Sequence, residues 1–211
     1  MERMRALTSR VVLPLLACTV AFGQYKEEPA GAPPSDVPAA ISAALQKDGA
    51  KITKSGAAYC EIWLRTQPPS GGAATEGATL SGVPQGALLG VVRFDGPGQD
   101  RRGQGIKPGL YTMRYGLIPI NGDHQGAAPQ RDFLLLSPIA NDTDLNATPA
   151  FDALVQMSQK ASGTPHPAVL SFWKADADAP TAISKQGDDW VLQDKLGTTP
   201  VSIIVIGIAS S

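Results

Sequence analysis

Cysteine and histidine, which build disulfides and metal centres, are scarce in this sequence: its 211 residues include two of each. One cysteine, Cys18, lies in an N-terminal segment that we expect to be removed or lipidated. Cys60 then has no partner for an intramolecular disulfide, so the folded part must be stabilised by packing alone. Cys60 alternates with Ile62 and Leu64 on the apolar face of a strand predicted over 59–66, which favours a buried thiol that packs like a small apolar side chain.

An excess of charge of one sign is also missing, because 18 Lys and Arg residues stand against 19 Asp and Glu residues, for a formal net charge of -1. No basic block occurs outside the N-terminal segment, which argues against a nucleic-acid partner. No later run is long enough to cross a bilayer. The stretch 201–209 is the most apolar, but it is short and rich in Ile and Val, as is typical of a buried strand.

The N-terminus has the pattern of an export signal. Three arginines precede an apolar run over 11–22, and small residues stand two apart at its end, Ala21 and Gly23. This pattern predicts a signal peptide over 1–23, cleaved between Gly23 and Gln24. We therefore expect an exported protein, periplasmic or secreted, with no membrane span once the leader is removed.

A second processing route stays open. Residues 15–18, Leu-Leu-Ala-Cys, resemble a bacterial lipobox, in which the cysteine is acylated and becomes the new N-terminus. The protein would then be lipid-anchored through Cys18. Because Leu16 is bulkier than the usual residue and the apolar run continues to Phe22, the sequence favours cleavage before Gln24.

The composition predicts the fold class. Only 18% of the residues are charged, whereas turn formers are abundant, with 22 glycines and 18 prolines. Such a composition favours a mainly β protein, and alternating apolar residues mark about eight short strands. We expect an antiparallel β-sandwich with one or two short helices, one over 36–46 and another that follows Thr148 and ends at Gly163.

The chain divides into three parts. Residues 1–23 are the predicted signal peptide. Residues 24–37 combine charges and prolines without apolar periodicity, which predicts a flexible lead, and residues 38–211 form a single β-sandwich domain. Within that domain the run 133–136 is apolar at every position, which predicts a strand covered on both faces.

One short motif suggests a relationship. Residues 108–111, Pro-Gly-Leu-Tyr, place a turn before a strand that carries Tyr111. The segment 106–115 resembles the Pro-Gly-x-Tyr strand motif of uncharacterised exported bacterial β-sandwich proteins. The resemblance implies a two-sheet sandwich, and it brings no catalytic residues with it.

Candidate site residues gather between two predicted strands. Asp123 and His124 are followed closely by Arg131 and Asp132, and the only other histidine, His166, stands at the start of a later strand. If these two strands point the same way, both imidazoles meet at one end of the sandwich. Two histidines and a carboxylate would suit a divalent metal, and the same five residues are the candidates for catalysis.

A simpler interpretation competes with this site. The segment around Asp123 is then a surface turn in which its carboxylate bonds local backbone, while Arg131 pairs with Asp132 or another surface acid. Because two histidines without a fixed spacing are a weak signal, we favour this interpretation and predict no cofactor.

Other side chains could contact a ligand. Arg101 and Arg102 stand in a Gly-rich loop, where they could bind an anion or remain solvated. Aromatic side chains could stack on sugars or peptides, although packing in the core explains them better; these are Tyr59, Trp63, Tyr111 and Tyr115.

Three functions follow from these features. The preferred one is a non-enzymatic binding or interaction module of a bacterial cell envelope, with an envelope protein, a glycan or a small molecule as its partner. The first alternative is an envelope hydrolase or metal-dependent enzyme that uses Asp123, His124, Asp132 and His166, which requires these four residues to converge. The second is a structural envelope component, which requires self-association through an exposed sheet edge. The sequence leaves open whether the protein is an enzyme.

Overall fold

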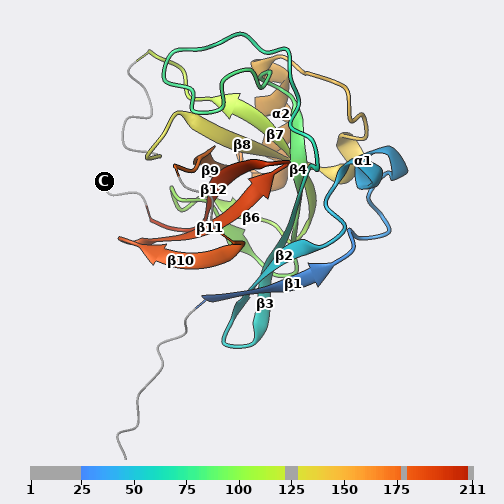
Figure 1. Ribbon diagram of the computed structural model, residues 1–211, viewed down its shortest axis with the longest axis vertical. Coiled ribbons are helices and arrows are strands. Elements are labelled where there is room, and N and C mark those ends of the chain that lie inside the picture. Colours follow the sequence, from blue (N-terminus) through green and yellow to red (C-terminus); the bar gives the residue numbers. More distant parts are fainter. Residues whose placement is uncertain (1–24, 122–127, 177–179, 209–211) are drawn as a thin grey trace, which may run out of the picture.

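The computed structural model describes residues 25–121, 128–176 and 180–208 (Figure 1). This part of the chain is mainly β and antiparallel with two α-helices, which confirms the predicted fold class. Its strands are β1 (Tyr25–Gly31), β2 (Gly49–Lys54), β3 (Ala57–Leu64), β4 (Leu88–Phe94), β5 (Gly98–Gln99), β6 (Gly105–Ile106), β7 (Gly109–Leu117), β8 (Asp132–Pro138), β9 (Val169–Lys174), β10 (Ala182–Gln186), β11 (Asp189–Leu196) and β12 (Thr199–Ile206). Its helices are α1 (Ala39–Ala44), the 3-10 helix η1 (Ile139–Asn141) and α2 (Phe151–Ser162).

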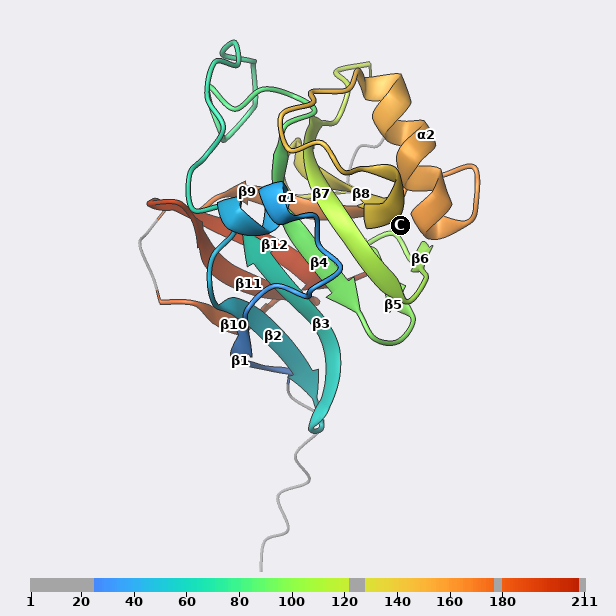
Figure 2. The ribbon, with the colours of Figure 1, turned by 90° about the vertical axis from the view of Figure 1, so that its right-hand side faces the viewer.

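Ten of these strands form a single antiparallel sheet, in the order β1-β2-β3-β4-β7-β8-β9-β12-β11-β10. The sheet twists and curls until its two edge strands, β1 and β10, come into contact (Figures 1 and 2). The body is therefore a nearly closed barrel. At this seam the rings of Tyr25 and Trp190 meet edge to face, with their centroids 5.2 Å apart.

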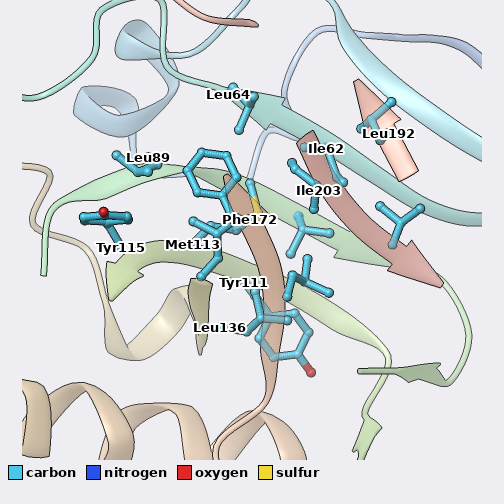
Figure 3. Close-up of a cluster of buried hydrophobic side chains, with 14 of the residues drawn as sticks. Ile62, Leu64, Leu89, Tyr111, Met113, Tyr115, Leu136, Phe172, Leu192 and Ile203 are labelled. Atoms are coloured by element: carbon cyan, nitrogen blue, oxygen red, sulfur yellow. The ribbon is translucent and has the colours of Figure 1, made fainter. Parts of the chain in front are cut away.

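Side chains that point inward from alternate strand positions fill the barrel (Figure 3). Cys60 belongs to this core, where only 2% of its surface is exposed and burial raises the pKa of its thiol. The interpretation of Cys60 as a small apolar core residue is thus confirmed. Other fully buried members are Ile62, Leu64, Leu89, Met113, Leu136, Phe172, Leu192 and Ile203.

Two helices cover patches of the outer face of the barrel. α1 packs over Trp63 on β3 and Leu88 on β4, and α2 packs over Phe133 and Leu135 on β8. β8 is therefore buried on both faces, as its unbroken apolar run predicts. Neither helix, nor any other helix of the described residues, is long and apolar enough to cross a membrane.

The helix ends agree in part with the sequence. α2 ends where predicted, because Gly163 adopts the left-handed conformation (φ 73°) that closes many helices. Its N-cap is Ala150, two residues after Thr148, so Thr148 does not cap it. α1 is shorter than the predicted 36–46 helix, and it begins after Pro38.

The prediction of a flexible lead over 24–37 is wrong for the residues of β1. This strand pairs with β2 along its length, from Tyr25 opposite Lys54 to Gly31 opposite Gly49. Its charged residues lie on an edge strand with one neighbour, where a proline such as Pro29 is tolerated because only one side of the strand must donate to the ladder.

The Pro-Gly-x-Tyr motif has a structural role. β7 begins at Gly109, and the Tyr111 hydroxyl donates a 2.7 Å hydrogen bond to the carbonyl of Lys107, four residues earlier. A Cβ at Gly109 would lie 3.2 Å from the Tyr111 hydroxyl oxygen, so the glycine leaves room for the tyrosine to fold back over the turn. The motif thus fixes the corner at which the chain enters β7.

Candidate functional site

The structure separates Asp132 from His166, two of the residues that the sequence groups into one site. Asp123 and His124 lie outside the described residues. β8 and β9 are antiparallel, with Phe133 opposite Ser171, so the condition that these two strands point the same way is wrong. Asp132 is the first residue of β8. Continued beyond Val169, the register of β8 and β9 places His166 opposite Pro138, the last residue of β8. Six residues of strand separate the two levels, or roughly 20 Å.

Asp132 has a structural role. Its carboxylate is fully buried and accepts hydrogen bonds from the backbone N–H groups of Thr79 (3.0 Å) and Leu80 (3.3 Å) and from the Tyr115 hydroxyl (2.6 Å). Burial raises the pKa of Tyr115, and the hydrogen bond to Asp132 raises it further. With three protein donors around it, this carboxylate anchors the long loop before β4 to the barrel.

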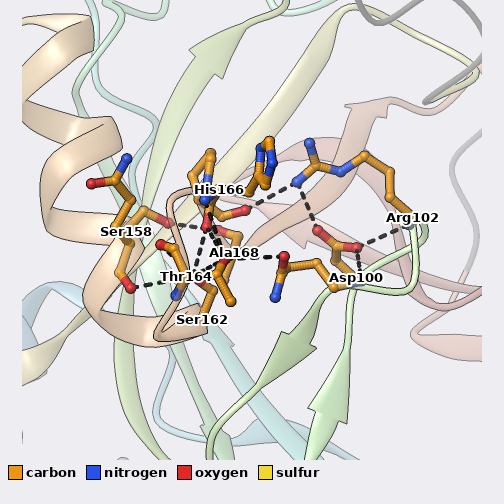
Figure 4. Close-up of polar contacts among 10 residues, drawn as sticks. Asp100, Arg102, Ser158, Ser162, Thr164, His166 and Ala168 are labelled. Carbon is orange, nitrogen blue, oxygen red and sulfur yellow. Dashed lines mark hydrogen bonds and ion pairs between the residues drawn. The ribbon is translucent and has the colours of Figure 1, made fainter.

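Arg131 and His166 also contact the backbone. The Arg131 guanidinium donates to the carbonyls of Ile118 (2.9 Å) and Glu76, in place of the predicted pairing with an acid. The His166 side chain is exposed, and its backbone N–H and carbonyl bond to Thr164 and Ser162 in the turn after α2 (Figure 4). Within the described residues, no group of three or more His, Cys, Asp or Glu side chains could hold a metal ion.

An apolar pocket opens on the outer face of the barrel, between β8, β9 and the first turn of α2. Phe133 and Ser171 lie opposite each other in the register and face outward, and Phe151 meets Phe133 edge to face at 6.4 Å. The pocket encloses about 570 Å³, including its open mouth. We call it the α2 pocket; its lining is Arg101, Arg102, Ile118, Pro119, Ala128, Phe133, Phe151, Pro167, Val169 and Ser171.

Two arginines from the β5–β6 turn form one wall of the α2 pocket, and both are paired with acids. Arg101 Nε lies 3.0 Å from the Asp189 carboxylate. Arg102 Nη2 donates to Asp100 Oδ2 at 2.8 Å and to the carbonyl of Pro167 at 3.0 Å. Because each guanidinium has a carboxylate partner, this wall is close to neutral. The surface suits an apolar ligand better than a free anion.

A polar network holds this wall in place (Figure 4). Asp100, only 1% exposed, accepts hydrogen bonds from the backbone N–H groups of Arg102 and Gln104, both at 2.9 Å, which fixes the β5–β6 turn. The Thr164 hydroxyl donates to the Gln104 side chain at 3.1 Å, and so ties this turn to the end of α2. Among the lining residues themselves, the hydrogen bond from Arg102 to the carbonyl of Pro167 joins the β5–β6 turn to the segment before β9.

A second group of acids lies at the barrel seam. The pKa of Glu27 is raised by burial and then by the charges of Asp194 and Asp48. Asp194 is 6% exposed, and burial raises its pKa although Lys195 N–H and the Thr181 hydroxyl donate to Oδ1. Among the described residues, no donor bonds its other oxygen, Oδ2. The raised pKa values mean that the folded state disfavours the ionised forms of Glu27 and Asp194.

The sequence indicated parts of this surface but did not predict the pocket. Arg101 and Arg102 were candidates for anion contact, yet their pairing with Asp100 and Asp189 depends on segments far apart in the chain. Trp63, Tyr111 and Tyr115 are buried, which confirms that they pack in the core. The unbroken apolar run 133–136 was the one available signal for the pocket, because it predicts a strand with apolar side chains on both faces, the outer face included.

The chain was compared with protein-family models, with curated proteins and with solved structures, and none of them matches it.

Proposed function

We propose that the protein is an exported binding module that holds a small, mainly apolar molecule in the α2 pocket. The observation that carries the proposal is the pocket itself: aromatic and aliphatic side chains line it, and the charges of its two arginines are balanced. Concave apolar sites with a few oriented polar groups are the usual form of small-molecule sites. The N-terminal export pattern supports a location outside the cytosol.

The competing functions have less support. An enzyme built from the four candidate residues needs them to converge, and Asp132 and His166 stand at opposite ends of the β8–β9 pair. A structural component that self-associates through a sheet edge needs an accessible edge, and the two edge strands β1 and β10 contact each other. The α2 pocket requires neither condition.

Titration with an uncharged fluorescent dye, Nile red, tests the proposal. The variant Val169→Asp places a carboxylate in the apolar lining, and burial of an unpaired charge beneath the ligand should weaken binding by about tenfold or more. Ser184→Asp introduces the same charge on the exposed strand β10 and should leave binding unchanged. Melting temperatures of both variants verify that they fold. Equal dye affinity in Val169→Asp and the parent protein would reject the α2 pocket as the binding site.

A further inference from the structure

Arg65 is held firmly by its backbone at the end of β3. Its N–H donates to the carbonyl of Leu89 at 2.8 Å, and its own carbonyl accepts from the N–H of Gly197 at 3.0 Å. It also forms a bridge with Leu45. Contacts from three separate segments therefore fix the position of this residue.

The side chain of Arg65 has few partners by contrast. Within the described residues it makes one hydrogen bond, from Nη1 to the carbonyl of Leu88, which is long at 3.4 Å. Nε is buried without a hydrogen-bond partner, and no carboxylate of the described residues forms an ion pair with this guanidinium. Partial burial lowers the pKa of Arg65. The structure thus holds a partly desolvated cation that no acid of the described residues neutralises.

Arg65 lines a polar pocket, which we call the Arg65 pocket. The pocket encloses about 680 Å³ with its open mouth, and it lies apart from the α2 pocket, with which it shares no residue. Its polar lining includes Ser70, Asn146 and Thr148, and three prolines give it apolar faces without N–H donors, namely Pro68, Pro69 and Pro84.

One wall of the Arg65 pocket is rigid because Arg114 fixes it from the inside of the molecule. Arg114 is fully buried and donates to the carbonyls of Asp144 (2.6 Å) and Ala147 (2.5 Å) in the loop before α2. It also donates to the carbonyl of Gly86, on the neighbouring loop. A Cβ at Gly86 would lie 2.5 Å from the carbonyl oxygen of Pro149, so the two loops are in direct contact. The pocket is therefore formed before any ligand arrives.

We propose that the Arg65 pocket binds a carboxylated sugar, such as a uronic acid residue of a glycan. A carboxylate matches the planar guanidinium and carries the single negative charge that one arginine balances. A phosphate would need further cations or a cluster of N–H donors, which the three prolines do not supply. The hydroxyl and amide side chains of Ser70, Asn146 and Thr148 suit sugar hydroxyl groups, and the proline faces suit the sugar ring.

The test is a titration of the isotope-labelled protein followed by NMR, with D-glucuronate as the probe and D-glucose as its uncharged counterpart. Glucuronate should shift the amide signals of Asn146 and Thr148, and glucose should not. Arg65→Gln removes the charge but keeps a shorter polar side chain, and should weaken glucuronate binding by about tenfold or more. Arg93→Gln is the matched control, because Arg93 already pairs with Glu61 and Asp95, and it should bind like the parent.

Three results would overturn the proposal: no shifts with glucuronate, equal affinity in Arg65→Gln, or tighter binding of inorganic phosphate than of glucuronate. Thr148→Val provides an independent test should Arg65→Gln fail to fold. It removes a hydroxyl from the lining and should weaken glucuronate binding while leaving Nile red binding unchanged. Because the Nile red experiment uses a different pocket, either proposal can fail without the other.

Discussion

Arg114 and Arg65 lie next to the same loop, which joins η1 to α2, yet their environments are opposite. Arg114 uses all five of its N–H donors: two go to the Asp142 carboxylate, at 2.6 and 2.7 Å, and three go to backbone carbonyls. Arg65 makes a single long hydrogen bond and has no acid partner within the described chain. One guanidinium is fully satisfied and buried, and the other is held in place with most of its donors unused.

The difference separates a structural charge from one that is available to a ligand. A buried charge is tolerated when its partners replace the water it has lost, and Arg114 meets this condition. Arg65 is only partly buried, so water at the pocket mouth can hydrate it until a ligand replaces that water. The number of unused donors is therefore a better guide to a binding role here than the residue type.

Removal of Arg114 should have the largest effect. Arg114→Met leaves Asp142 buried with only the Thr112 hydroxyl as a side-chain donor, and it also leaves three carbonyls without their donor. We expect a loss of about 3–5 kcal/mol in the free energy of unfolding, measured by urea denaturation. A loss below about 1 kcal/mol would show that the pair is not the anchor of this loop.

The double variant Arg114→Met/Asp142→Leu tests whether the loss in the free energy of unfolding comes from the buried Asp142 carboxylate that Arg114→Met leaves unpaired. Because it removes both ions, it should be destabilised by less than the sum of the two single variants, with a coupling of about 1–3 kcal/mol in urea denaturation. Additive effects would indicate that the carbonyl contacts of Arg114, rather than its pairing with Asp142, dominate.

Asp194 extends the contrast to a buried acid whose Oδ2 accepts no hydrogen bond from the described residues. Its folded-state pKa lies above the ordinary value of 3.8, so the unfolded state loses its proton first as the pH rises. The stabilisation from the protonated carboxyl is thus complete below about pH 3.8 and is lost as the pH rises through the folded-state pKa. Asp194→Asn should gain on the order of 1 kcal/mol over the parent at pH 7 and little at pH 3.5.

Urea denaturation of both proteins across this pH range measures the difference. Ser184→Asn changes an exposed residue of β10 that carries no titratable group; it is the control and should have the same effect on stability at both pH values. A gain for Asp194→Asn that is equal at both pH values would contradict the assigned cause.

Arg65 should show the smallest effect on stability. Arg65→Met removes the charge but preserves the stem, and we expect the free energy of unfolding to change by no more than about 0.5 kcal/mol. Thermal and urea denaturation of Arg65→Met beside Arg114→Met provide the measurement. A loss comparable to that of Arg114→Met would mean that Arg65 serves the fold, and the contrast between the two arginines would disappear.

The sequence predicted those features that depend on short-range patterns. Alternation predicted the buried face around Cys60, and Gly163 marked the end of α2. The unbroken apolar run in β8 predicted coverage on both faces. β1 was missed because an edge strand can be charged and contain Pro29 while the pairing with β2 holds it in place.

The two pockets could not be predicted from the sequence. The α2 pocket depends on the register of β8 and β9, and the Arg65 pocket depends on the absence of an acid partner for Arg65 within the described residues. Phe133 and Ser171 form one wall because β8 and β9 are antiparallel, which no local pattern specifies. Arg65 looks like any arginine at the end of a strand. Its importance comes from the lack of a nearby acid in the described fold, and it is the folded arrangement, not the sequence, that shows this.

The position of β1 has a consequence for where the barrel would sit in a cell. Its first residue, Tyr25, comes only one residue after the predicted signal peptide cleavage site. If the alternative route acylates Cys18, six residues separate the lipid from the first strand, and an extended chain of that length reaches roughly 20 Å. A linker this short would keep the seam side of the barrel close to the membrane surface. It would also limit which faces of the barrel a large envelope polymer can approach.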